Sequence, residues 1–100
     1  MLIISGKLTI DPDALEAVMA AASPMMAATR AEEGNHAYVF SLDMADRSVL
    51  HVYERWESEQ ALAAHFATPH MAEFQAVLGP AVRDMDLARW AISEGPLPVF

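Results

Sequence analysis

The chain of 100 residues contains no cysteine. This absence excludes disulfide bonds, cysteine nucleophiles, iron–sulfur clusters and zinc sites built from thiolates. Basic residues are scarce too, because 6 lysines and arginines stand against 14 acidic residues and leave a formal net charge of −8. The basic residues are scattered along the chain, so the sequence predicts no clustered basic surface for nucleic acid or for an anionic membrane.

Long apolar runs are also missing, although a helix that spans a bilayer needs roughly 20 consecutive apolar residues. The longest weakly polar stretch, residues 14–29, is rich in Ala and Met and poor in larger aliphatic residues. The opening MLIISGKLTI has no basic region before its apolar part, so we expect no signal peptide and a cytoplasmic location. No glycine-rich phosphate loop, dinucleotide-binding motif or nucleophile elbow is present.

Apolar residues, in contrast, are abundant. They make up 54% of the chain, against roughly 45–50% in an average globular protein. The length suits a single domain, residues 1–100. We expect the apolar surplus to form a ligand pocket or a buried interface between subunits.

Alternating and helical patterns predict the elements of the first half of the chain. Residues 1–10 alternate as a strand, and residues 11–13 carry the start signals of a helix. We expect Pro24 to kink or interrupt this helix and Gly34 to stop it. Residues 35–44 and 48–57 then predict a hairpin. In the first strand the residues expected to share one face are His36, Tyr38, Phe40 and Leu42. In the second they are Leu50, Val52, Glu54 and Trp56.

The second half predicts a helix in two pieces and a last strand. Ser58 is the expected N-cap of the first piece, and Thr68-Pro69 starts the second, which Gly79-Pro80 ends. The expected inward residues are Leu62, His65 and Phe66 in the first piece and Met71, Phe74, Val77 and Leu78 in the second. Residues 82–93 form the last strand, and we expect the apolar tail after it to dock on this subunit or on a partner.

The resulting order, β-α-β-β-α-β, is the ferredoxin-like split βαβ pattern of the α+β class. Its antiparallel sheet carries helices on one face only. Because several strands carry apolar residues on both faces, we expect a second copy of the sheet to cover the open face.

His65 is the foremost candidate for chemistry. It shares a helical face with Leu62, so it points toward the sheet, where an imidazole can exchange a proton near pH 7. The alternative is a structural histidine bonded to a backbone carbonyl. His70 follows five positions later, whereas two metal ligands on one helix prefer a spacing of four.

Further candidates lie on the predicted strands. His36, His51 and Glu54 could join a histidine–carboxylate cluster, but nothing fixes such a cluster in space, and we predict no metal site. A buried Glu54 needs a partner. Trp56 is either a lid over a flat aromatic ligand or a plug at the end of the core.

Two segments, EEGNHAYVF and HVYERWESEQALAAHFATPHMAEF, resemble the antibiotic biosynthesis monooxygenase (ABM) family. Its members carry a glycine before the second strand, a Glu-x-Trp at the end of the third, a helix with a histidine, then a small-Pro-His step and a Phe. The matching residues here are Gly34, Glu54, Trp56, His65, Thr68, Pro69, His70 and Phe74.

This resemblance implies a dimeric α+β barrel, in which two ferredoxin-like subunits press their open sheet faces together. It also implies oxygenation of a phenolic or quinol polyketide by O2 without a cofactor. On this reading His65 handles protons. The substrate-binding residues are expected to be Tyr38, Glu54, Trp56, Phe66, His70, Met71 and Phe74.

Haem-degrading monooxygenases of the same superfamily use an asparagine, a tryptophan and an axial histidine. Those positions hold Gly6, His65 and Gln75 here, so haem degradation is not expected. The sequence therefore supports two hypotheses about function. The chain is a cofactor-free monooxygenase of aromatic compounds, or it is a small dimeric protein that binds an apolar or aromatic metabolite without turning it over.

Overall fold

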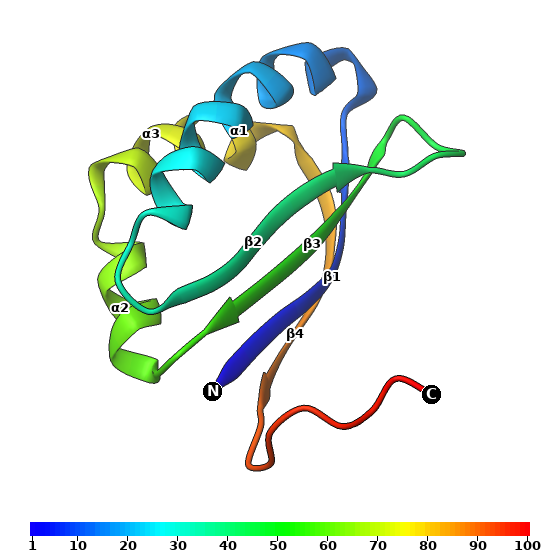
Figure 1. The fold of residues 1–100 in the computed structure, drawn as a ribbon. Coiled ribbons are helices and arrows are strands. Elements are labelled where there is room, and N and C mark those ends of the chain that lie inside the picture. The colour runs from blue at the N-terminus through cyan, green and yellow to red at the C-terminus, as the bar shows by residue number, and fades with distance from the viewer.

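The computed structural model describes all 100 residues and confirms the ferredoxin-like α+β architecture. A single antiparallel sheet has four strands in the order β2-β3-β1-β4. The helices cover one face of this sheet and leave the other open (Figure 1). In chain order the elements are β1 (Leu2–Ile10), a short 3-10 turn (Pro12–Ala14), α1 (Leu15–Arg30), β2 (Asn35–Leu42), β3 (Val49–Trp56), α2 (Glu59–Phe66), α3 (Pro69–Ala81) and β4 (Val82–Ala91).

The core lies between the sheet and the helices, where the alternating patterns predicted it. β1 and β3 are the two central strands, and their register pairs Leu8 with Leu50 and Leu2 with Trp56. Successive side chains of a strand point to opposite faces, so these four residues all lie under the helices. The residues of β3 that were predicted to share one face are all buried: Leu50, Val52, Glu54 and Trp56.

Helix α1 differs from its prediction in two places. Asp11 caps its opening turn by accepting a hydrogen bond from the Asp13 amide, as expected. Pro24 does not interrupt the helix, which runs unbroken from Leu15 to Arg30. Pro24 is exposed and so is Ala20, whose carbonyl loses its partner, so water can satisfy that carbonyl.

Gly34 does not end α1, which already stops at Arg30. It lies instead in the turn before β2, with a φ of +83°, a conformation that favours glycine. A β-carbon at this position would come within 2.6 Å of the Ala61 β-carbon on α2. The glycine therefore allows this turn to lie directly against α2.

The expectation that His36 shares one face of β2 with Tyr38 is wrong. The register of β2 against β3 shifts between Asn35 and Ala37, which makes His36 an extra residue at a β-bulge. His36 is exposed, pairs with Glu57, and borders a hollow on the open face of the sheet. Tyr38, after the bulge, is fully buried on the helix side as predicted.

The caps of α2 and α3 are those expected. The Ser58 side chain accepts a hydrogen bond from the Ala61 amide, and Thr68 accepts one from the Met71 amide. Phe66 and Val77, however, are exposed rather than inward. Phe66 ends α2 on the wall of a pocket, described below, and its ring stays largely exposed there. Helix α3 also continues through Gly79-Pro80 to Ala81, so Pro80 lies in its last turn and β4 follows at once.

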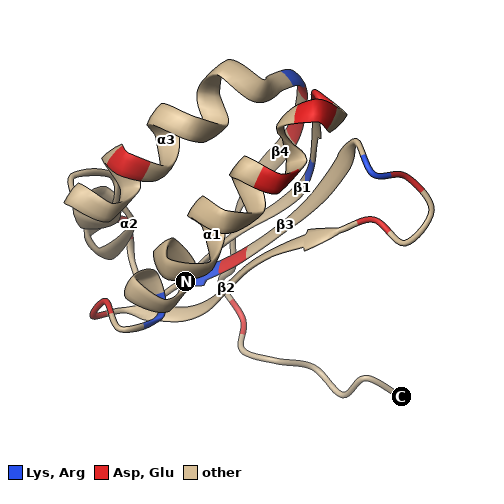
Figure 2. Cartoon of the chain, turned by 90° about the horizontal axis from the view of Figure 1, so that it is seen from above, with Lys and Arg blue, Asp and Glu red and all other residues tan.

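The apolar tail does not dock on its own subunit. Leu97, Val99 and Phe100 are almost fully exposed, and the tail extends away from the sheet after β4 (Figure 1). That half of the expectation is wrong, and docking on a partner stays a prediction. Lysines and arginines are dispersed over β1, α1, the β2–β3 turn, β3 and β4 (Figure 2).

Candidate functional site

An apolar pocket of about 470 Å³ opens between the sheet and the ends of α2 and α3. All four strands contribute to its floor, and 11 of its 14 lining residues are hydrophobic. The other three are Glu54, the only charged residue on the wall, Gln75 and Gly79, and Tyr38 adds a hydroxyl to the apolar set. Such a pocket suits a flat apolar ligand that carries one or two polar groups.

Glu54 reaches this pocket from the middle of the sheet. It lies on β3 and is only 7% exposed, and its Oε1 accepts a hydrogen bond from Trp56 Nε1 at 3.0 Å. Burial raises the pKa of Glu54 above the ordinary carboxyl value, and the bond from Trp56 and the nearness of His65 offset part of that rise. A carboxylate with a raised pKa is a stronger base than one in water.

Tyr38 forms the adjoining part of the wall. Burial, together with the neighbouring Glu54 and Glu32 carboxyls, raises the pKa of Tyr38, so its hydroxyl stays protonated at neutral pH. That hydroxyl is buried and has no hydrogen-bond partner in the protein. The ring packs edge-on against Trp56, with centroids 6.2 Å apart, and against His65 at 5.1 Å.

His65 lies behind the pocket wall and does not line the pocket. Its side chain is fully buried, with the ring centroid 4.8 Å from that of Trp56. The predicted backbone-carbonyl partner is not observed, because His65 Nδ1 bonds instead to Glu32 Oε2 at 2.8 Å. A carboxylate only accepts, so the proton lies on Nδ1, and Nε2 is left without a partner.

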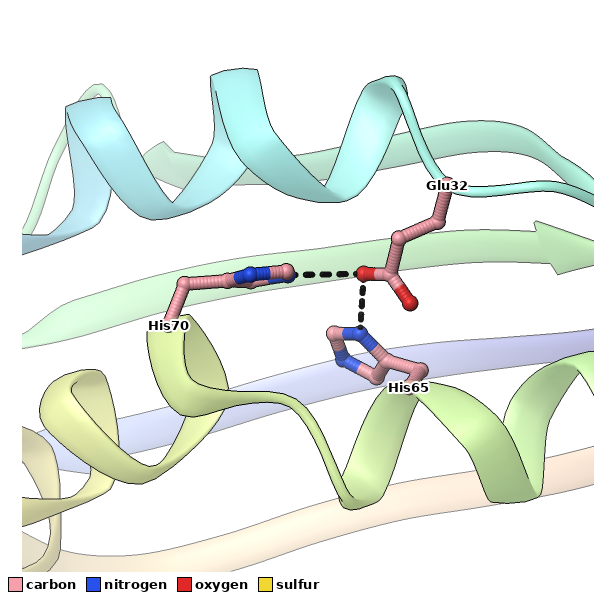
Figure 3. A group of neighbouring side chains, drawn as sticks. All are labelled: Glu32, His65 and His70. Carbon is pink, nitrogen blue, oxygen red and sulfur yellow. Dashed lines mark hydrogen bonds and ion pairs between the residues drawn. The ribbon is translucent and has the colours of Figure 1, made fainter.

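Glu32 also binds the second histidine of the helical segment. His70 Nε2 lies 2.8 Å from the same Glu32 Oε2, so one oxygen atom accepts from both rings (Figure 3). Sequence reasoning missed Glu32, because an acidic residue in a turn after a helix is ordinarily a solvated charge. A possible signal was its position just before Gly34, the residue that brings this turn against α2.

The other histidines do not join this cluster. His36 pairs with Glu57, and His51 pairs with Asp43 at 2.7 Å, both at the surface. These partners hold the pKa of Glu57 and of Asp43 below the ordinary carboxyl value. The cluster of His36, His51 and Glu54 considered from the sequence is therefore not formed.

The predicted substrate-binding residues divide into two groups. Tyr38, Glu54, Phe66 and Met71 line the pocket. Trp56 and Phe74 belong to the core, and Trp56 has no exposed surface with which to cover a ligand. His70 and Phe74 border a separate hollow between α1 and α3.

Comparison with known proteins settles the family. The family model for antibiotic biosynthesis monooxygenase matches residues 1–77. The chain belongs to this family. The match takes in both central strands of the ABM domain and every residue of the pocket wall up to Gln75, while β4 and the tail lie beyond it.

Two relatives are similar in sequence. The ABM chain is 37% identical over 68 residues to "Putative monooxygenase Rv0793" of Mycobacterium tuberculosis, a match that covers 68% of this chain and 66% of the relative, just under two thirds. It is 26% identical over 76 residues to "Putative monooxygenase YcnE" of Bacillus subtilis, covering 76% and 80% of the two chains.

A solved structure shows the same fold over the whole length. A "putative antibiotic biosynthesis monooxygenase" from Deinococcus radiodurans superposes with a TM-score of 0.84 at 22% identity and covers 100% of both chains. In the ABM chain, none of the helices has both the length and the apolar character needed to cross a bilayer.

Proposed function

We propose that this ABM protein is a cofactor-independent monooxygenase that uses O2 to oxidise a phenolic or quinol aromatic compound, such as a polyketide. The pocket between the sheet and the ends of α2 and α3 is the proposed substrate site. The observation that carries the proposal is Glu54, one buried carboxyl group with a raised pKa on an otherwise apolar wall. Membership of the family supports the class of reaction.

The chemistry needs a base and an oriented substrate rather than a redox group of the protein. The Glu54 carboxylate removes a proton, and the resulting phenolate is rich enough in electrons to transfer one to O2. The two radicals join in a C–O bond, and loss of water from the hydroperoxide leaves a carbonyl. In sum a CH2 carbon, or its aromatic C–H tautomer, and O2 become C=O and water, and the substrate supplies all four electrons. The apolar wall orients the ring and keeps bulk water away from the reactive anion.

This assignment moves the proton-handling role away from His65. Glu54 lines the pocket, whereas His65 is enclosed behind Tyr38 and Trp56. We therefore propose that His65 is a positioning residue, which braces the two aromatic rings beside Glu54. A buried ring bonded to Glu32 is well suited to that role, since its orientation is fixed.

The test is O2 consumption by metal-stripped protein with a panel of hydroquinones and polycyclic phenols. Glu54→Gln keeps the hydrogen bond from Trp56 but removes the base, so turnover is expected to fall by roughly 10²–10⁴-fold, the usual contribution of acid–base catalysis. Glu33→Gln, an exposed carboxyl in the turn after α1, is the control and should keep full activity. Turnover that survives Glu54→Gln would exclude Glu54 as the base. Saturable binding of a phenol without O2 uptake would favour the non-catalytic binding protein instead.

We also propose that the single domain works as a homodimer whose open sheet faces pack together. The open face and its margins carry exposed apolar side chains: Met1, Tyr53, Trp90 and Ile92. A dimer would cover these side chains and offer the apolar tail a place to dock. Sedimentation at micromolar concentration should give twice the chain mass of 10.9 kDa, and Trp90→Glu should shift the protein toward monomer. A wild-type monomer would contradict the barrel.

A further inference from the structure

Three side chains from distant segments meet on the helical side of the sheet (Figure 3), and none of them lines the pocket. Glu32 lies in the turn after α1, His65 in the last turn of α2, and His70 in the first turn of α3. One ligand atom from each lies within 4.8 Å of the other two. This is the one group of three or more such side chains that the fold brings together.

We propose that Glu32, His65 and His70 bind one divalent transition-metal ion, with Zn²⁺ as the occupant that best suits the ligands. Two imidazole nitrogens and one carboxylate oxygen form a common set for zinc with three protein ligands, which leaves further positions for water. The inference does not depend on the proposed oxygenation, because none of the three residues lines the pocket.

The hydrogen-bonded arrangement brings together the atoms that an ion requires. His65 Nδ1 and His70 Nε2 each lie 2.8 Å from Glu32 Oε2. Bonds of about 2.0–2.1 Å in a tetrahedral site place ligand atoms roughly 3.3 Å apart. Each histidine–glutamate distance therefore needs to open by about half an ångström, and the two ring nitrogens, which lie within 4.8 Å of each other, need to reach that same separation. The ion would replace the two N–H protons between the rings and the carboxylate, and each ring would carry its proton on the other nitrogen.

The three side chains of the cluster differ in burial, which gives a metal ion a path from solvent. The His65 side chain is fully enclosed, while those of His70 and Glu32 are 24% and 14% exposed. His65 is held on two sides by Trp56 and Tyr38, so one ligand is fixed before the ion arrives. The partly exposed side leaves room for the water ligands, and the net charge of −8 favours the approach of a cation.

The surface histidines provide matched controls within the same chain. His36 with Glu57 and His51 with Asp43 are also imidazole–carboxylate pairs, but neither pair has a third ligand. A cation that merely collects on the acidic surface should bind the surface pairs as well as the cluster. Binding of a cation by the cluster should not change when either surface pair is mutated.

The experiment titrates metal-stripped protein with Zn²⁺ by calorimetry and with Co²⁺ by visible absorption. We expect one equivalent to bind, with the visible bands of low-coordinate Co²⁺, and a saturating Zn²⁺ excess to raise the unfolding midpoint by roughly 10 °C. Glu32→Gln and His70→Ala should each weaken binding by at least about 100-fold, beyond the 10–100-fold typical of groups outside the coordination shell. His36→Ala and His51→Ala should bind as the wild type does. Absence of binding at micromolar metal, or binding that survives both cluster variants, would overturn the proposal.

A wild-type measurement keeps the test decisive if a cluster variant fails to fold. Paramagnetic Co²⁺ should shift or broaden the imidazole NMR signals of His65 and His70 first, at one equivalent. Signals of His36 and His51 that respond first, or all four responding together, would show adventitious surface binding and refute the site.

Discussion

The pocket and the histidine cluster lie back to back, on either side of the Tyr38 and Trp56 rings, yet they differ in almost every physical respect. The pocket wall is largely apolar and carries the single carboxyl of Glu54. The cluster is polar and closely packed, and its carboxylate already accepts from two rings. An apolar pocket beside one carboxyl with a raised pKa suits the binding and deprotonation of a substrate, whereas a compact set of nitrogen and oxygen ligands suits a structural or metal-binding role.

The adjacent residues His65 and Phe66 belong to different regions, His65 to the cluster and Phe66 to the pocket wall. Substituting each in turn is the sharpest test of the contrast. His65→Ala should lower the free energy of unfolding by about 3 kcal/mol, because it leaves a cavity under Trp56 and Tyr38 and removes a donor from the partly buried Glu32. Urea unfolding would measure it, with His51→Ala as the surface control, which should stay within about 0.5 kcal/mol of wild type. A loss as small as that of the control would show that the cluster is not part of the folded core.

Phe66→Ala should have the opposite profile and a smaller effect. The ring is 58% exposed in the absence of ligand, so stability should change little. A bound aromatic compound would lose part of its apolar contact, and its affinity should fall by about 1 kcal/mol, or roughly fivefold. Fluorescence titration with a phenol that the wild type binds would measure this, with exposed Val77→Ala on α3 as the control. Unchanged affinity would place the ligand elsewhere.

The smallest expected effect is the pH dependence that Glu54 gives to stability. Its pKa is raised in the folded state, so between the ordinary carboxyl pKa and the raised one the folded state binds more protons than the unfolded state. Glu54 therefore makes the free energy of unfolding fall as the pH rises through that window. The difference between wild type and Glu54→Gln should show this slope, since the exposed carboxyls contribute equally to both. A flat difference would mean that Glu54 is better solvated than its burial indicates.

The sequence was sufficient for the elements whose formation depends on local chemistry. The alternation of β3 predicted that Glu54 and Trp56 point inward, and the caps at Ser58 and Thr68 predicted where α2 and α3 begin. Such patterns depend on side-chain periodicity and on backbone donors a few residues away, which are visible in the sequence.

The composition of the site depended on long-range packing and could not be read in this way. His65 and His70 lie 33 and 38 residues after Glu32 in the chain. Glu32 contacts them only because the turn after α1 lies against α2. The bulge that turns His36 to the open face depends on the register of two strands, which no single strand specifies. The sequence analysis made His65 the foremost candidate for chemistry, whereas the ionisable group on the pocket wall is the Glu54 carboxyl.

Gly34 shows how closely that packing is set. A β-carbon there would lie 2.6 Å from the β-carbon of Ala61, well inside van der Waals contact, and the backbone φ of +83° adds strain for any other residue. The contact of Glu32 with the two histidines therefore requires the turn at Gly34 to pack against Ala61 with no room for a side chain. A single hydrogen atom, in place of a methyl group, lets α2 approach the turn that carries Glu32. The cluster thus depends on a residue that has no side chain to contribute to it.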